Sequence, residues 1–146
     1  MQLSCKSEYA LLALFELAQH YNDGEPQQIK AIAATQDIPE RYLEQLLAAL
    51  RRRGLVRSQR GAKGGYVLGR EPWNIDLYEV VQSIEGKENA EARHSTSPAS
   101  TVELDVLHET WQEVQAAAEA ALRKYTLQDL CDRKVQRQRG TVMYYI

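Results

Sequence analysis

The sequence contains only two cysteines, Cys5 and Cys131, among 146 residues. Two thiols do not make the disulfide framework of a small secreted protein. We therefore expect a cytoplasmic protein, since thiols stay reduced in that compartment. The longest apolar run is far too short to cross a bilayer, and the chain shows no signal-peptide pattern at Met1. No membrane partner is expected.

The motifs of common enzyme classes are also missing. No Ser–His–Asp or Cys–His order stands out, and no phosphate-binding loop follows a predicted strand. No paired carboxylates have a pocket in which to sit. The composition, 44% hydrophobic and 26% charged, is that of an ordinary globular protein, and the length suits one domain with an appended element. We predict that the protein is not an enzyme.

Positive charge is slightly outnumbered by negative charge overall, but it is concentrated in one segment. The chain carries −2, yet residues 41–70 hold eight Arg or Lys and a single acid, Glu44. This segment is therefore +7 and the remainder −9. A basic segment in an acidic protein indicates a nucleic-acid site, where it would face the phosphates. The alternative is a solvated helix face followed by a basic hairpin.

Within residues 39–66 the pattern predicts a DNA-reading helix followed by a two-stranded wing. Four leucines fall on one helix face, and a glycine, Gly54, is placed to end the helix after an arginine run. Residues 55–58 and 66–68 are predicted strands, joined by the glycine-rich loop 61–65. The leucines are Leu43, Leu46, Leu47 and Leu50, and the opposite face carries Arg41, Tyr42, Glu44, Gln45, Ala48, Arg51 and Arg52.

Two helices are predicted before this segment. Residues 4–21 form a helix so apolar that most of its surface should be buried, and residues 28–36 form a shorter one. Pro39 suits the first turn of the helix that follows. Two helices joined by a short turn predict a helix-turn-helix, whose second helix enters the major groove. Lys6 either contacts a phosphate or lies in an ordinary exposed first turn.

After the wing, residues 71–74 read as a loop, and Asp76 can cap a helix that continues to about Ile84. Residues 86–101 have almost no apolar side chains and are predicted to be a flexible loop. Thr126 and Asp129 resemble a capping box for a short helix through Cys131. The tail that follows is basic and then apolar, and the sequence leaves open whether it adds a strand, docks or is disordered.

Residues 102–124 return to helical periodicity. Apolar residues step by four and three along this stretch, as in a coiled coil. We expect a dimer interface here, the alternative being that the stripe packs on its own domain. The stripe consists of Leu107, Trp111, Val114, Ala118, Ala121 and Tyr125.

The predicted fold class is thus mainly α. It consists of a winged helix-turn-helix domain with a two-stranded wing over residues 1–85 and a flexible loop over 86–101. A long C-terminal dimerisation helix and a short final helix occupy 102–131, and a basic and then apolar tail occupies 132–146.

Several runs of residues resemble the Rrf-two family of bacterial winged-helix transcription regulators. The resemblance covers residues 1–85 closely and the later helices more loosely, and its motifs are specific in combination. It implies a sequence-specific DNA-binding regulator, mainly a repressor, that binds a partly palindromic operator on double-stranded DNA as a homodimer. The runs are Leu3-Ser4-x-Lys6-x-x-Tyr9-Ala10, Tyr42-Leu43-Glu44-Gln45-Leu46, Gly54-Leu55-Val56 and Arg60-Gly61-x-x-Gly64-Gly65-Tyr66.

The resemblance also implies roles for individual residues. Tyr42, Glu44 and Gln45 would meet bases and phosphates in the major groove, where Gln can pair with adenine and Glu can accept from cytosine. Arg60 would enter the minor groove, whose negative potential attracts arginine. In the wing motif that ends at Tyr66, glycines would let the backbone approach the sugar-phosphate chain. These glycines are Gly61, Gly64 and Gly65, and our own candidates for phosphate contacts are Arg41, Arg51, Arg52 and Lys63.

Some members of that family hold an iron–sulfur cluster through three cysteines in and just beyond the loop at 86–101. This sequence has no cysteine between Cys5 and Cys131, so the usual three-cysteine cluster is excluded and no cofactor is expected. A cluster or metal would need unusual ligands. The resemblance offers Glu8, Asp105 and His108, with His94 as a fourth candidate; the alternative is that these are ordinary helix and loop residues.

Two further alternatives remain open. Cys5 or Cys131 would be a redox thiol if its pKa were lowered, whereas a buried cysteine would be inert. The protein could also act by docking on an enzyme or another protein partner, as some members of the family do in addition to binding DNA.

Overall fold

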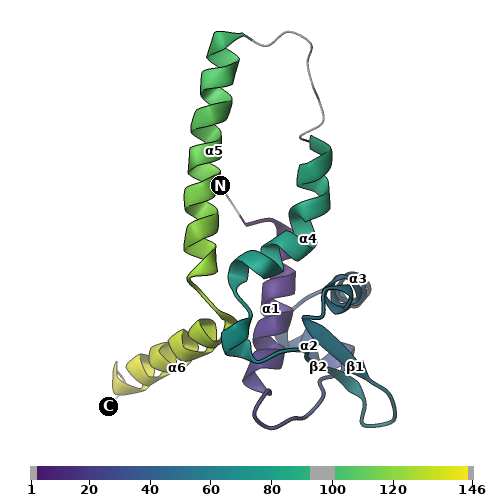
Figure 1. Cartoon of the computed structure of the whole chain (residues 1–146). Coiled ribbons are helices and arrows are strands. Elements are labelled where there is room, and N and C mark those ends of the chain that lie inside the picture. Colours follow the sequence, from purple (N-terminus) through teal and green to yellow (C-terminus); the bar gives the residue numbers. More distant parts are fainter. Residues whose placement is uncertain (1–2, 93–100, 145–146) are drawn as a thin grey trace.

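The computed structural model describes residues 3–92 and 101–144, and within these ranges the side chains of all but 87–92 and 142–144 (Figure 1). The described chain is mostly helical, with one small antiparallel sheet. The elements in chain order are α1 (Cys5–Gln19), α2 (Ile29–Gln36), α3 (Glu40–Arg52), β1 (Val56–Gln59), β2 (Gly65–Leu68), the 3-10 helix η1 (Pro72–Asn74), α4 (Leu77–Ala92), α5 (Val102–Arg123) and α6 (Leu127–Tyr144).

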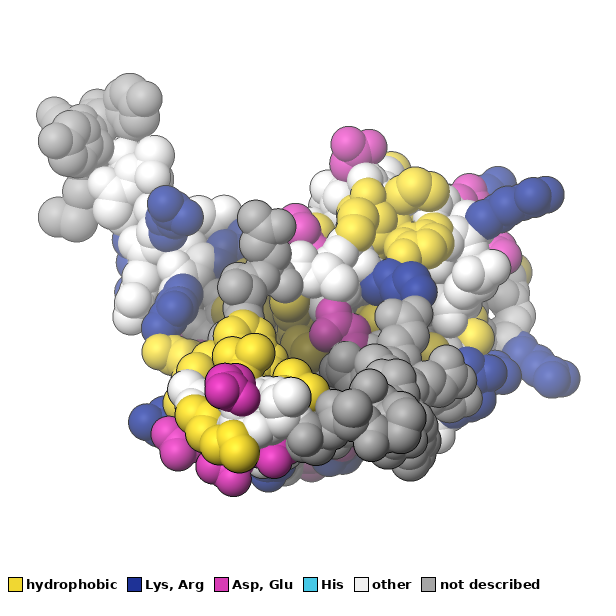
Figure 2. Space-filling view, turned by 90° about the horizontal axis from the view of Figure 1, so that it is seen from above, with side chains coloured by type: hydrophobic (Ala, Val, Ile, Leu, Met, Phe, Trp, Pro, Cys, Tyr) yellow, Lys and Arg dark blue, Asp and Glu magenta, His cyan; other side chains and the backbone are white. Residues whose placement is uncertain are grey.

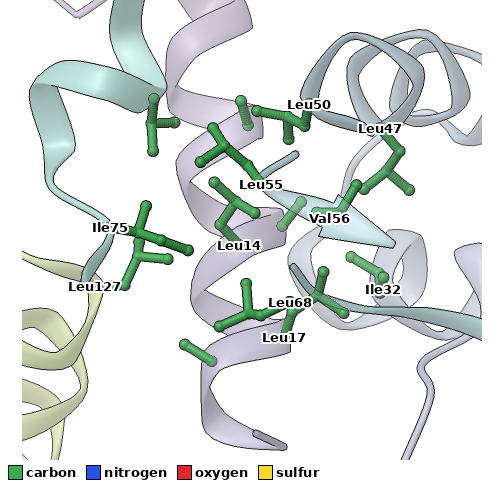
Figure 3. Packing of buried hydrophobic residues seen from close by; sticks show 14 of the residues in the cluster. Leu14, Leu17, Ile32, Leu47, Leu50, Leu55, Val56, Leu68, Ile75 and Leu127 are labelled. Atoms are coloured by element: carbon green, nitrogen blue, oxygen red, sulfur yellow. The ribbon is translucent and has the colours of Figure 1, made fainter. Parts of the chain in front are cut away.

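Helix α1 forms the centre of the core. Leu14 and Leu17 of α1 are buried among leucines of α3 and apolar residues of α2 and the wing, whereas Ile75 and Leu127 pack together on another side (Figure 3). The predicted burial of the first helix is therefore confirmed. Burying a leucine contributes roughly 1.5–3 kcal/mol, so this cluster holds the reading helix and the wing to one support.

Local hydrogen bonds define where several helices begin. The Ser4 hydroxyl accepts from the Ser7 backbone N–H at 3.2 Å, and the Asp76 carboxylate accepts from the Glu79 N–H at 2.8 Å. The predicted capping box is also present. The Asp129 carboxylate accepts from the Thr126 N–H at 2.8 Å, and the Thr126 hydroxyl accepts from the Asp129 N–H at 3.2 Å. Aspartate therefore replaces the usual longer acid without loss of the reciprocal bond.

The predictions for α4 and α6 were wrong about length. Helix α4 continues past Ile84 to Ala92, so residues 86–92 are helical rather than loop, and residues 93–100 lie outside the described part. Helix α6 runs to Tyr144 instead of ending near Cys131. Both extensions are rich in Ala, Glu, Lys, Arg or Gln, which favour helix even where few apolar residues mark a buried face. Pro39 is the N-cap of α3 rather than a first-turn residue.

Helix α5 rises beside α4 and away from the body of the molecule (Figure 1). The structure describes all of its residues, and none is buried. Leu107 is 59% exposed and Trp111 is 51% exposed. The alternative that the apolar stripe packs on its own domain is therefore not supported by the described residues. No helix in the described ranges combines the length and apolar character needed to cross a membrane.

Candidate nucleic-acid interface

Helix α3 has two chemically distinct sides. Its four leucines are buried in the core, as the spacing predicted. On the other side Arg41, Glu44, Gln45, Arg51 and Arg52 are exposed, with Tyr42 half-buried at their edge. A helix with this division presents long polar and cationic side chains to a partner while its apolar side fixes its orientation. The reading helix predicted from sequence is therefore present, with its candidate residues on one surface.

Tyr42 is held from the side by α1. Its ring meets the ring of Tyr9 edge to face, with 5.6 Å between the centroids and 82° between the planes. A hydrogen bond with the Cys5 side chain raises the pKa of Tyr9. The start of α1 therefore contacts the start of the reading helix. The spacing of residues in the sequence did not predict this contact.

The wing is a short hairpin in which Val56 pairs with Leu68 and Gln59 pairs with Gly65. Strand β1 is shifted by one residue from the predicted strand, and β2 begins one residue earlier than predicted and ends at the same residue. Arg60, Gly61 and Lys63 are exposed at the tip of the hairpin. The cationic side chains that sequence reasoning placed on the wing therefore project from it.

Two wing glycines have a structural reason in addition to the predicted approach to DNA. A Cβ at Gly64 would lie 2.3 Å from the Gln59 carbonyl oxygen, and a Cβ at Gly65 would lie 2.5 Å from the Gln27 carbonyl oxygen. Gly65 also has a φ of 155°. Gly64 excludes a side chain because of the wing's own backbone, and Gly65 does so because of the segment before α2, so both glycines meet a structural requirement that does not depend on DNA.

The base of the wing is bonded to the segment before α2. Gln27 and Tyr66 exchange two backbone hydrogen bonds, of 2.9 Å and 2.8 Å. The Tyr66 side chain, a predicted wing contact with DNA, is half-buried and packs against the core. The bridge joins the wing to the helix-turn-helix, and sequence reasoning missed it because an isolated pair leaves no periodic signal.

The cationic surface differs in detail from the predicted set. Arg53 and Arg57 are exposed beside the predicted cations and were not singled out, although the charge count included them. Arg70 belongs to the same count, but its guanidinium lies 2.5 Å from the Glu79 carboxylate and is partly neutralised there. Arg51 donates to the Ser58 hydroxyl at 3.4 Å and so ties the end of α3 to β1.

The candidate metal ligands are not gathered in one chain. Glu8 is exposed on α1, and Asp105 and His108 are exposed on α5, whereas His94 lies outside the described residues. Within the described ranges no three His, Cys, Asp or Glu side chains converge. An iron–sulfur cluster prefers thiolate ligands, and the two thiols stand apart on α1 and α6. The donor set of this chain does not fit such a cluster.

The two cysteines differ in environment. Cys131 is half-buried, and burial raises the pKa of its thiol, with the neighbouring Asp132 adding to the effect. This is the inert environment expected of a packed cysteine. Cys5, in contrast, is exposed at the first residue of α1, so the alternative of a buried, inert cysteine does not hold for Cys5.

A helix-turn-helix with an exposed polar and cationic second helix, followed by a cationic two-stranded wing, defines a winged helix-turn-helix DNA-binding protein. Residues 3–133 match the family Rrf2, described as iron-dependent transcriptional regulator. The chain belongs to the Rrf2 family. Its class is therefore that of DNA-binding transcription regulators and not of enzymes.

Individual relatives agree with this assignment. The chain is 37% identical over 148 residues to the HTH-type transcriptional regulator CymR of Bacillus subtilis (strain 168), with all of both chains covered. It is 32% identical over 130 residues to IscR of Xenorhabdus nematophila, covering 89% of this chain and 79% of the relative.

Solved structures of relatives have the same fold. The structure of T. potens IscR superposes with a TM-score of 0.79 at 36% identity, covering 94% of this chain and 91% of that one. The structure of CymR, titled the global cysteine regulator of B. subtilis, gives 0.73 at 36% identity, covering 91% and 98%. The predicted winged-helix fold is confirmed.

Proposed function

We propose that this chain is a homodimeric, cytoplasmic repressor that binds a partly palindromic operator on the nucleoid. Helix α3 would enter the major groove and the wing the adjacent minor groove. One observation carries this proposal: the exposed cations of α3 and of the wing belong to one packed unit. The Gln27–Tyr66 bridge and the Arg51–Ser58 contact tie the parts of that unit together.

Within this unit the side chains divide by role. Glu44 and Gln45 are exposed on the face of α3 and would read bases, with Tyr42 at the edge of the groove. Arg60 projects from the wing tip and would read the minor groove. The remaining candidates, which would contact phosphates and set the register without reading sequence, are Lys6, Arg41, Arg51, Arg52 and Lys63, with Gly61 at the wing tip.

Dimer formation would use α5. Its stripe of Leu107, Trp111 and Val114 is exposed, with exposed fractions of 59%, 51% and 40%. Exposed apolar side chains in a row along one helix mark an interaction surface. A two-fold dimer presents two copies of α3 to two half-sites, which is what a palindromic operator requires.

The proposal includes DNA binding without a bound cofactor, because the donor set of this chain does not fit a thiolate-held cluster. An absorption spectrum with iron and sulfide assays on protein purified without oxygen tests this point. Stoichiometric iron and sulfide would contradict it. Glu8, Asp105, His108 and both cysteines would then be substituted in turn.

The salt dependence of binding tests the DNA proposal directly. An operator would be selected from random duplexes, and its dissociation constant measured by fluorescence anisotropy at several salt concentrations. Each neutralised phosphate lowers the logarithm of affinity by about 0.9 per decade of salt. A steep slope, with competition by the unlabelled operator but not by a scrambled duplex, is expected. A flat slope would contradict DNA binding and favour regulation by docking on a protein partner.

A further inference from the structure

A small pocket lies between the end of α1 and the wing. It has a volume of about 170 Å³ and is lined by α1, by the turn that follows α1 and by both strands of the hairpin. A water molecule takes up about 30 Å³ of the liquid, so the pocket has room for roughly six groups of that size. Pockets for drug-sized ligands measure about 300–1,000 Å³, so this one suits a much smaller molecule.

The wing contributes a cation to this pocket. Successive side chains of a strand point to opposite faces of the sheet. Ser58 faces α3, because its hydroxyl accepts from Arg51 at 3.4 Å. Arg57 therefore lies on the other face of the hairpin, with Val67 directly opposite on β2, and both residues line the pocket. The Arg57 side chain is thus directed toward the end of α1 rather than toward the reading helix.

The turn after α1 contributes an acid, Glu25. Two other acids of this region lie beside His20, whose ring nitrogens are 3.4 Å from the Glu16 carboxylate and 3.9 Å from the Asp23 carboxylate. Glu25 has no such neighbour, and among the described residues neither Glu25 nor Arg57 belongs to an ion pair. The pocket therefore presents two opposite charges that do not neutralise each other.

Hydrogen bonds fix the walls of the pocket. The Gly24 N–H donates to the His20 carbonyl at 3.2 Å, and the Gln27 side chain donates to the Glu25 carbonyl at 3.2 Å. On the other wall, the Gln27–Tyr66 bridge holds β2 in place. A site whose walls are already fixed binds a small ligand without a large cost of ordering.

The pocket is separate from the apolar stripe of α5. Figure 2 looks toward the first turns of α5, where hydrophobic and acidic side chains gather. The turn after α1 and the wing lie at the opposite end of the molecule (Figure 1). A dimer contact through the α5 stripe therefore does not use the pocket.

We propose that this pocket binds a free α-amino acid with a small apolar side chain. Its carboxylate would pair with the Arg57 guanidinium, a geometry that is frequently bidentate, and its ammonium group would pair with Glu25. Leu17 and Val67, which also line the pocket, would contact the apolar side chain. The bound molecule would join the turn to the wing and so limit the motion of the hairpin that carries Arg60.

Calorimetry on the intact protein tests the site without DNA. L-Alanine, L-valine and L-leucine would be titrated in turn, and at least one should bind to one site per chain with a dissociation constant of about 1 mM or below. The amine that lacks its carboxylate and the acid that lacks its amino group should each bind about fivefold more weakly, since each loses one ion pair. Absence of saturable binding by all three amino acids would overturn the proposal.

Two charge-removing variants test the placement. Arg57→Gln and Glu25→Gln should each weaken binding of the amino acid about fivefold, and both positions are exposed, so the fold should be retained. Arg139→Gln and Glu40→Gln remove the same charges from exposed positions that do not line the pocket, and binding should be unchanged. Equal affinity in all four variants would place the ligand elsewhere and overturn the proposal.

The effect on DNA rests on the proposed function, whereas binding of the amino acid does not. A saturating amino acid should tighten operator binding about fivefold, because the wing is then already fixed when DNA binds. Glu25→Gln should remove this effect. Unchanged operator affinity with the pocket occupied would overturn the link between pocket and wing. Calorimetric binding without operator binding would contradict the proposed function alone, and operator binding without any calorimetric response would contradict the pocket alone.

Discussion

The ring of Tyr9 on α1 packs edge to face against the ring of Tyr42 on α3, with 5.6 Å between the centroids. This contact connects the first turns of the central helix to the residue proposed to enter the major groove. Tyr42 is only half-buried, so α1 supplies a support that limits its rotamers without removing it from the surface.

Replacing Tyr9 with leucine should lower both the free energy of unfolding and the operator affinity. Aromatic pairs contribute about 0.5–1.5 kcal/mol beyond their area, so a loss of about 1 kcal/mol is expected in urea unfolding. Tyr9→Phe keeps the ring and should retain operator binding. Equal operator affinity in both variants would show that Tyr42 needs no support from α1.

Arg60→Ala should weaken binding to the selected operator, because it removes a cation from the wing tip. Arg139→Ala removes the same charge from α6 and is the control for net charge. Glu44→Ala should instead reduce the discrimination between the operator and single-base variants, at a cost of about 1–3 kcal/mol at one position. The measurement is anisotropy with a panel of duplexes. Unchanged affinity in both Arg60→Ala and Glu44→Ala would contradict the assigned site.

Gly65→Ala should destabilise the wing, because its Cβ would lie 2.5 Å from the Gln27 carbonyl oxygen. The structure must shift there, and the positive φ adds strain of roughly 1 kcal/mol. Gly140→Ala on α6 meets nothing within 4 Å and should stabilise its helix by about 0.5–1 kcal/mol. Hydrogen exchange at β1 and β2 is the measurement. A wing protected equally in wild type and Gly65→Ala would contradict the close approach to Gln27.

Trp111→Glu should convert the dimer to a monomer, because it places charge in the middle of the exposed α5 stripe. Trp73→Glu is a suitable control, since Trp73 is 54% exposed on η1 and lies outside α5. Light scattering gives the mass of each variant. Operator affinity should fall only for Trp111→Glu. A Trp111→Glu dimer would exclude this stripe as the interface.

Cys5 should react faster than Cys131 with iodoacetamide at pH 8. Burial raises the pKa of Cys131, so less of it is thiolate at that pH. The same shift has a consequence for stability. The unfolded chain ionises first, so the contribution of Cys131 to stability is complete below the unfolded pKa of about 8.5 and is lost as the pH rises from there through the raised pKa of the folded chain. Peptide mapping by mass spectrometry measures the reactivity, and faster labelling of Cys131 would contradict its assigned environment.

The sequence was most informative where side chains repeat along one face. Leu43, Leu47 and Leu50 predicted α3 because their spacing admits one buried face, and they are buried there. The ends of α4 and α6 were missed because Lys, Glu, Arg and Gln favour helix without marking a face. The Gln27–Tyr66 bridge and the Tyr9–Tyr42 contact depend on tertiary packing, which spacing does not encode.

The sequence predicted the type of site, a basic DNA-binding surface, but not which residues belong to it. Charge along residues 41–70 identified the basic surface, yet only the structure separates exposed Arg57 from Arg70, which pairs with Glu79. The same applies to Gly64, for which the family motif implied an approach to DNA and the structure adds a close approach to the Gln59 backbone. Ion pairs and close contacts between a glycine and the backbone arise only in the folded chain.

In the proposed dimer, helix α5, none of whose residues is buried in the single chain, would make the regulator sensitive to its own abundance. A helix that becomes covered on dimerisation links folding, assembly and operator occupancy by mass action. Below the dissociation constant of the dimer, the concentration of the DNA-competent form rises with the square of chain concentration. A modest change in synthesis would therefore change occupancy of a target promoter more than proportionately, before any signal is received.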